Sequence, residues 1–328
     1  MNKLQSLMPG LAAAFFIALC AWLGGRSLPL IGAPVLGILI GMGVALAGSF
    51  QNLQAGTRFA SKKLLQLSVV LLGFEMNMRN VLAVGTESLF VMVFTLAAAF
   101  LTAWIVGRAL KLSSVTATLI GVGTAICGGS AIAATAPVLN ADDGEIAHSI
   151  STIFLFNVIA VFLFPAVGHL LRMSDTGFGI WAGTAVNDTS SVLAAGYAYS
   201  DAAGKLATIV KLTRTLMIIP VTFVLSLYVS RTSGKRGTFS LSKAVPWFVL
   251  GFIAAAALNS SGVMPAELAR LLSRSGKFLI VVAMASIGLN THIGKLLSNG
   301  LRPIVLGLVC WTSLALTSLA AQYFLGLL

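Results

Sequence analysis

Residues 123–130 of the chain read GTAICGGS, and residues 183–191 read GTAVNDTSS. Each stretch interrupts an apolar segment of helical length, 114–139 and 177–200, with glycine and polar side chains. A backbone N–H or C=O left unpaired in hydrocarbon costs several kcal/mol, so such a break survives only where protein, water or a ligand satisfies it. We therefore expect two discontinuous or re-entrant helices at membrane depth. Re-entrant or tightly broken helices are favoured, and two fully crossing segments stay open as the alternative.

The composition of the whole chain is that of a membrane protein. Of its 328 residues 58% are hydrophobic and 9% are charged, whereas soluble domains are about a quarter charged. The pattern predicts an all-α polytopic membrane protein with about 9–11 hydrophobic segments. These segments run roughly over 8–24, 30–48, 64–76, 88–107, 114–139, 146–170, 177–200, 204–230, 244–259, 277–290 and 303–326.

The net charge of +12 comes from Lys and Arg in short clusters between the apolar segments. Nucleic acid is not an expected partner, because these clusters form no basic face interleaved with aromatic residues. With Met1 in the cytoplasm, more of the clusters fall on the cytoplasmic side, as the positive-inside rule requires. We therefore expect a multi-pass protein of the bacterial inner (plasma) membrane with a cytoplasmic N-terminus.

The two interruptions are copies of each other, 60 residues apart. Seven of the 28 residues in 123–150 are identical to the residue 60 positions later. A weaker self-match at an offset of 215 pairs Gly73 with Gly288. We expect a single transporter domain over 1–328, with an extra N-terminal span at 1–25 and two inverted repeats at 27–172 and 176–328.

Hydroxyl and acidic side chains follow each break, where a helix would begin. Free N–H groups at a helix N-terminus favour an anion, so two such ends facing each other would form an anion cradle. For Ser130, Ser190 and Asp188 the alternative is plain N-capping. For Gly128 and Gly129 the alternative is close helix packing.

Four polar side chains fall inside apolar segments. Asp188 is an acid at expected mid-membrane depth, where it could bind a coupling proton or cation, or pair with Lys211 or Arg214. Lys211 and Arg214 share one helix face, and they could contact an anionic substrate, pair with Asp188, or extend to the membrane surface. Asn157 is a buried amide that could assist the coupling site or join helices by hydrogen bonding.

No pattern in the chain indicates an enzyme or a metal centre. Glu145 and His148, beside Asp142 and Asp143, have a spacing that could hold a metal, but an acidic aqueous loop is the preferred interpretation. No hydrolase arrangement or phosphate-binding GxxxxGK[ST] is present. We expect no cofactor and no metal, although a coupling proton or sodium ion is compatible with Asp188.

The segments GVGTAICGGSAIAA, from Gly121, and AGTAVNDTSSV, from Ala182, resemble those of a bacterial family of inner-membrane proteins that carry the label sulfate exporter. The resemblance covers nearly the whole chain. That family looks related to a superfamily of cation/proton antiporters and anion transporters, including bile-acid symporters, with inverted repeats and two discontinuous helices. The resemblance implies secondary transport. It places the following residues at the discontinuous elements: Thr124, Cys127, Gly128, Gly129, Ser130, Asn187, Asp188, Thr189, Ser190 and Ser191.

The sequence thus predicts a secondary transporter that exports a small, sulfate-like anion by alternating access. The helix N-termini with Lys211 or Arg214 would hold the anion, and Asp188, with Asn157, would serve a coupling proton or ion. The expected partners are the anion and the lipid bilayer, with a homodimer as one option. The rivals are an anion channel or uncoupled uniporter, an intramembrane enzyme using Cys127 or Asp188, and a sensory or assembly subunit.

Overall fold

The computed structural model describes residues 3–27, 32–48, 51–233, 247–291 and 300–327, and in these ranges all regular structure is helical. The chain divides into two compact units. Unit 1 comprises Met1–Ala83, Leu193–Lys205 and Trp247–Ile293, and unit 2 comprises Val84–Val192, Leu206–Pro246 and Gly294–Leu328. Each unit contains residues from both expected repeats, so the two units do not correspond to the two repeats. The repeats at 27–172 and 176–328 stay a prediction.

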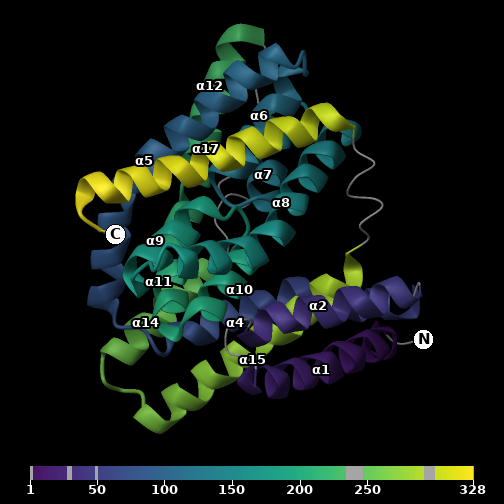
Figure 1. The fold of residues 1–328 in the computed structure, drawn as a ribbon, viewed down its shortest axis with the longest axis vertical. Coiled ribbons are helices and arrows are strands. Elements are labelled where there is room, and N and C mark those ends of the chain that lie inside the picture. The colour runs from purple at the N-terminus through teal and green to yellow at the C-terminus, as the bar shows by residue number, and fades with distance from the viewer. Residues whose placement is uncertain (1–2, 28–31, 49–50, 234–246, 292–299, 328) are drawn as a thin grey trace. The chain divides into compact units, whose positions relative to one another are not determined.

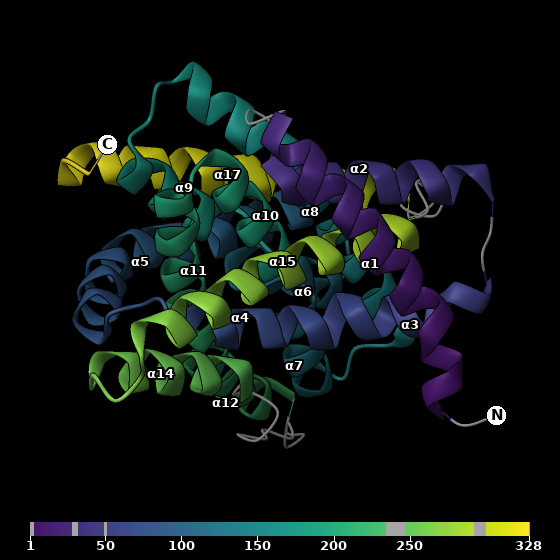
Figure 2. The same cartoon turned by 90° about the horizontal axis from the view of Figure 1, so that it is seen from below.

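Unit 1 is built from the N-terminal helices together with two helices from late in the chain (Figure 1). Its elements are α1 (Lys3–Ser27), α2 (Gly32–Ala47), η1 (Gln51–Leu53), α3 (Gln54–Phe59), the π-helical turn η2 (Ala60–Leu64), α4 (Leu65–Gly73), α14 (Trp247–Ser260) and α15 (Ala266–Asn290). Helix α15 packs on α1, α2 and α4, and Figure 2 shows α1 crossing it.

Glycine allows α2 and α15 to approach closely. A Cβ on Gly41 would overlap the carbonyl oxygen of Ala285, and a Cβ on Gly288 would overlap that of Ile38. Without a driving force from water, helices in lipid associate through such close backbone contact between small residues. Gly288, which the weak self-match pairs with Gly73, is therefore a residue at which two helices pack closely.

An ionic cluster ties the turn after α4 to two other segments of unit 1. Glu75 accepts from Lys205 at 2.6 Å and lies 3.2 Å from Lys277, which in turn lies 2.5 Å from Asp201. Ser273 also donates to Glu75. Partial burial raises the pKa of Glu75, but the hydrogen bonds from Lys205 and Ser273 and the charge of Lys277 outweigh it, lowering the pKa from 4.5 to about 2.

Unit 2 contains both interrupted helices. Its elements are α5 (Met78–Ala109), which begins in unit 1, α6 (Ser114–Ala125), α7 (Gly129–Leu139), α8 (Asp143–Leu170), α9 (Asp175–Ala185), the first turn of α10 (Thr189–Tyr199), most of α11 (Asp201–Leu216), α12 (Ile218–Ser233) and α17 (Leu301–Leu325). Helix α17 lies across α6, α8 and α9 (Figure 1). Trp181 of α9 stacks on Phe164 of α8, with ring centroids 4.2 Å apart, and donates to the carbonyl oxygen of Ala315 in α17 at 3.1 Å.

Six helical stretches in the described ranges are long and apolar enough to cross a membrane, with α11 and α12 counted together as Asp201–Arg231. The molecule is an all-α polytopic membrane protein, as the composition predicts. Each of the eleven apolar segments overlaps one helix or an interrupted pair, including α1 at the expected first span, and residues 30–31 and 244–246 of these segments lie outside the described ranges.

The helix boundaries differ from the prediction in several places. Helix α5 begins at Met78 instead of residue 88, and α15 begins at Ala266 instead of residue 277. The chain before Leu65 is already helical from Gln54, through α3 and η2. The segment 204–230 is interrupted at Met217, because Pro220 has no N–H to donate to the preceding turn.

Candidate functional site

The candidate site is built from two helix breaks, both within unit 2. Helix α6 ends at Ala125 and α7 begins at Gly129, while α9 ends at Ala185 and α10 begins at Thr189. Gly128 has φ +69° and ψ −127°, a conformation that side chains disfavour. Because α6 and α7 have 12 and 11 residues, each half reaches about 18 Å, roughly half of the membrane thickness. Each half therefore has about the length that reaches from a membrane surface to mid-depth.

The two breaks meet. A Cβ built on Gly128 would lie 3.6 Å from Cβ of Asp188 and 3.7 Å from Nδ2 of Asn157. Asn157, on the neighbouring helix α8, accepts a hydrogen bond from the backbone N–H of Asp188 at 3.1 Å. The expectation that Asn157 joins helices by hydrogen bonding is thus confirmed, and it joins α8 to the second break.

Asp188 caps α10. Its Oδ2 accepts from the backbone N–H of Ser190 at 3.0 Å, and the Ser190 hydroxyl also donates to this oxygen. The N-cap interpretation is therefore confirmed for Asp188 and wrong for Ser190. It is also wrong for Ser130, because Gly128 occupies the N-cap position of α7 and no side chain caps that helix.

Lys211 is buried where α6 and α9 end. Its Nζ donates to the carbonyl oxygens of Ile126 at 2.7 Å, Val186 at 3.0 Å and Asn187. A lysine ammonium has three protons, so its hydrogen bonds are fully used by the ends of the two helices.

Arg214, one turn further along α11, binds the same two ends. Its Nε donates to Ala125 O at 2.5 Å, its Nη1 to Thr184 O at 2.5 Å, and its Nη2 to Thr124 O. Helix C-termini carry partial negative charge and unpaired carbonyl groups, and buried cations stabilise both. Lys211 and Arg214 therefore hold the C-terminal ends of α6 and α9 together.

The contacts of the two cations follow the sequence repeat. Arg214 binds the carbonyl oxygens of Thr124 and Thr184, and Lys211 binds those of Ile126 and Val186. Each pair of residues is separated by the offset of the self-match in the sequence. Each cation therefore binds the carbonyl oxygens of two residues that occupy equivalent positions in the two breaks.

Two of the alternatives for these cations are wrong. No ion pair within 4.0 Å joins Asp188 to Lys211 or Arg214 in the described part of the chain. Both side chains are 0% exposed, so neither extends to the membrane surface. Contact between substrate and these cations stays a prediction, and it would require a carbonyl group to give up its hydrogen bond.

The break residues also include polar atoms without partners. Thr124 Oγ1 and Asn187 Oδ1 are buried and, among the described residues, make no hydrogen bond. A buried polar atom left unpaired costs about 1–3 kcal/mol, so each position favours a ligand, an ion or water.

The remaining predicted residues line the same two breaks. Cys127 is buried, and its Sγ lies 2.9 Å from Oγ of the exposed Ser130. Thr189 and Ser191 are buried in the first turn of α10. Gly129 has open space around its Cβ position, so the packing interpretation is wrong for this residue.

Thr184 was missed by the sequence reasoning, although it is the repeat counterpart of Thr124. Its carbonyl oxygen accepts from Arg214, and its hydroxyl lies 2.6 Å from Oγ of Ser318 on α17. Its position 60 residues after Thr124 is the sequence signal that could have identified it.

The acidic stretch before α8 has a structural role. Asp142 accepts from the backbone N–H of Glu145 at 2.7 Å, and Glu145 accepts from that of Asp142 at 3.2 Å. This reciprocal arrangement is a capping box, which stabilises the start of α8.

Fold and site together define a polytopic helical membrane protein with two interrupted helices. The two breaks, residues 126–128 and 186–188, meet at a polar region that we call the crossing. The chain belongs to the family described as conserved hypothetical protein 698, which matches residues 9–307. It is 49% identical to a UPF0324 membrane protein of Streptococcus pyogenes serotype M18, over 98% of each chain. It is also 43% identical to a UPF0324 membrane protein of Fusobacterium nucleatum, over 99% of each chain.

Proposed function

We propose that the protein is a secondary transporter that exports a small, sulfate-like anion by alternating access. It would act in the bacterial inner membrane, with a cytoplasmic N-terminus, as a monomer or homodimer. The proposal is carried by the contact of Gly128 with Asp188, which brings the N-termini of α7 and α10 together. The first N–H groups of each helix have no partner within the helix and can bind an anion.

The buried charges support an anionic substrate. Lys211 and Arg214 supply two positive charges, and no carboxylate lies within 4.0 Å of either among the described residues. Asp188 supplies one negative charge close to the helix N-termini. An anion at the crossing would therefore feel a net positive field from the two cations, even without a direct hydrogen bond to them.

The side chains at the N-termini offer a place for the anion. In this proposal the N–H groups of Gly129 and Ser130 and the Ser130 hydroxyl face it from α7. Thr189, Ser190 and Ser191 face it from α10. The unpartnered oxygens of Thr124 and Asn187 are available to a coupling ion or water.

Asp188 is the proposed coupling group. It is the partly exposed acid at the crossing, and protonation or sodium binding would cancel its repulsion of an anion. Asn157 would keep the backbone of Asp188 in place through its 3.1 Å hydrogen bond. Export can also use the inside-negative potential, which is worth about 2.3 kcal/mol per charge per 100 mV.

Non-enzymatic transport is favoured over intramembrane catalysis. Cys127 lies against Ser130, and a serine hydroxyl is no base that could activate a thiol. An anion channel would use the same positive field, so the two functions must be separated by kinetics.

The test is flux of sulfate, sulfite, a sulfonate and a carboxylate in proteoliposomes. We expect one of these anions to move faster than in empty vesicles, with stimulation by the same anion on the opposite side. Asp188→Asn and Ser130→Ala should each reduce this flux, whereas Arg231→Gln, at an exposed site in the last turn of α12, should not. A flux without trans-stimulation would indicate a channel, and equal flux in all variants would place the substrate elsewhere.

A further inference from the structure

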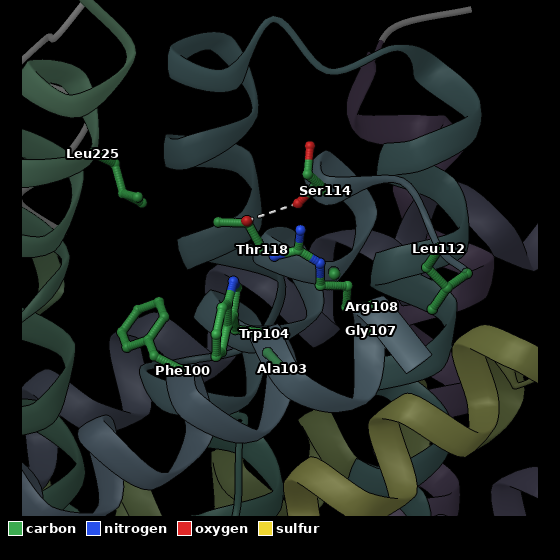
Figure 3. A pocket seen from close by; sticks show the side chains of 10 residues that line it. Phe100, Ala103, Trp104, Gly107, Arg108, Leu112, Ser114, Thr118 and Leu225 are labelled. Carbon is green, nitrogen blue, oxygen red and sulfur yellow. Dashed lines mark hydrogen bonds between the residues drawn. The ribbon is translucent and has the colours of Figure 1, made fainter. Parts of the chain in front are cut away.

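A second site lies on unit 2, and none of its lining residues belongs to either helix break. A cavity of about 460 Å³ opens between the end of α5, the start of α6 and the middle of α12. Figure 3 shows Trp104 and Arg108 reaching from α5 toward Ser114 and Thr118 of α6, with Leu225 of α12 on the other side. Its volume lies within the range of ligand pockets, about 300–1,000 Å³.

The cavity has a charged end and an apolar end. Arg108 is the charged residue of the lining, and its guanidinium lies 5.9 Å from the centre of the Trp104 ring. In the described part of the chain, no carboxylate lies within 4.0 Å of Arg108. Phe100, Trp104 and Leu225 form the apolar wall. A ligand that fits must therefore combine a negative charge with a hydrocarbon part.

The position of the cavity points to a lipid. Helix α5 has 32 residues, a length of about 48 Å, which exceeds the roughly 30 Å of the hydrocarbon core. Arg108 in its last turn therefore lies near the headgroups, where tryptophan is also enriched. Basic pockets between membrane helices are recurrent sites for phospholipid headgroups.

We propose that this cavity binds an anionic phospholipid. Arg108 pairs with the phosphodiester. The first turn of α6 adds N–H donors, because the capping side chain of Ser113 accepts from the N–H of Thr116 and leaves the earlier N–H groups of the turn to a ligand. An acyl chain follows Phe100, Trp104 and Leu225.

The neighbouring carboxylate favours a lipid over free phosphate. Glu145 accepts from the Ser113 hydroxyl at 2.6 Å, one residue from the lining. Its negative charge repels a doubly charged inorganic phosphate more than a phosphodiester, which has a single charge. Free phosphate would also find no polar partner along the apolar wall of Phe100, Trp104 and Leu225.

The test is native mass spectrometry of the purified full-length protein with dioleoylphosphatidylglycerol or dioleoylphosphatidylcholine. Wild type and Arg231→Gln should bind phosphatidylglycerol in preference to phosphatidylcholine. Arg108→Gln should weaken phosphatidylglycerol binding by about tenfold, as expected for loss of one charged hydrogen bond. Arg231 is matched to Arg108 as an exposed arginine in the last turn of a helix.

A second variant and a competitor complete the experiment. Ser114→Trp should fill the cavity and reduce phosphatidylglycerol binding while circular dichroism stays unchanged. The proposal is overturned if Arg108→Gln and Arg231→Gln bind the lipid equally, or if phosphatidylcholine binds as well as phosphatidylglycerol. Displacement of the lipid by inorganic phosphate at equal concentration would likewise overturn it, in favour of a free anion.

Discussion

Gly128 and Asp188, the N-cap residues of two interrupted helices, lie in contact, with 3.6 Å between the Cβ position of the glycine and Cβ of the aspartate. The chain therefore brings two helix N-termini together on one side of the crossing. Lys211 and Arg214 bind the two C-termini on the other side. The two cations therefore lie at the helix C-termini, and the Asp188 carboxylate lies at the N-terminus of α10.

Gly128→Ala should destabilise the protein and reduce transport. The residue has φ +69°, where an alanine costs about 1–3 kcal/mol, and this backbone strain is the cause, because the new methyl group would make only an ordinary contact with Asp188. The matched control is Gly129→Ala, because nothing lies within 4 Å of its Cβ position. Thermal unfolding in detergent should show a lower Tm for the first variant alone, and equal Tm values would contradict this account of the break.

Lys211→Met should lower the stability of unit 2 by several kcal/mol. The substitution removes the desolvation cost of a buried charge, but it leaves three carbonyl oxygens without their donor, at about 1–3 kcal/mol each. Lys63→Met, at an exposed lysine, is the control for the same side-chain change. Thermal unfolding measures both, and an unchanged Tm for Lys211→Met would show that its three hydrogen bonds are not needed for folding.

Acid should weaken unit 1 through Glu75. Its pKa is lowered from 4.5 to about 2 in the folded protein, so folding favours the ionised form. The resulting stability is fully present above about pH 5 and is lost as the pH falls from 4.5 toward 2. Glu75→Gln should be less stable at pH 7, with a smaller loss between pH 5 and 3. A wild-type Tm with the same pH dependence as that of the variant would exclude this role.

Gly41→Ala should disturb the packing of α2 on α15, because the new Cβ would overlap the carbonyl oxygen of Ala285. Such overpacking typically costs about 1–3 kcal/mol. Gly43→Ala on the same helix has no neighbour within 4 Å and should be neutral or slightly stabilising, since alanine favours a helix by up to about 1 kcal/mol. The difference in Tm between these two variants tests the close approach of the helices, and its absence would refute it.

Much of the architecture was predictable from local patterns. Apolar length predicts the helices, because a helix satisfies its own backbone in lipid. Glycine and polar residues within 123–130 and 183–191 predict the breaks. The interruption at Met217 was missed, although Pro220 is visible in the sequence, since proline in a membrane helix is often accommodated without a break.

The sequence by itself determined that the protein is an all-helical membrane protein with two related interruptions, because hydrophobicity and glycine content act locally. Only the tertiary structure decided that Lys211 and Arg214 bind backbone carbonyl groups and that Asp188 caps a helix instead of pairing with them. Backbone groups are the same at every residue and leave no trace in the order of side chains. Their partners are set by the path of the chain, which alone brings residues 60 positions apart to one cation.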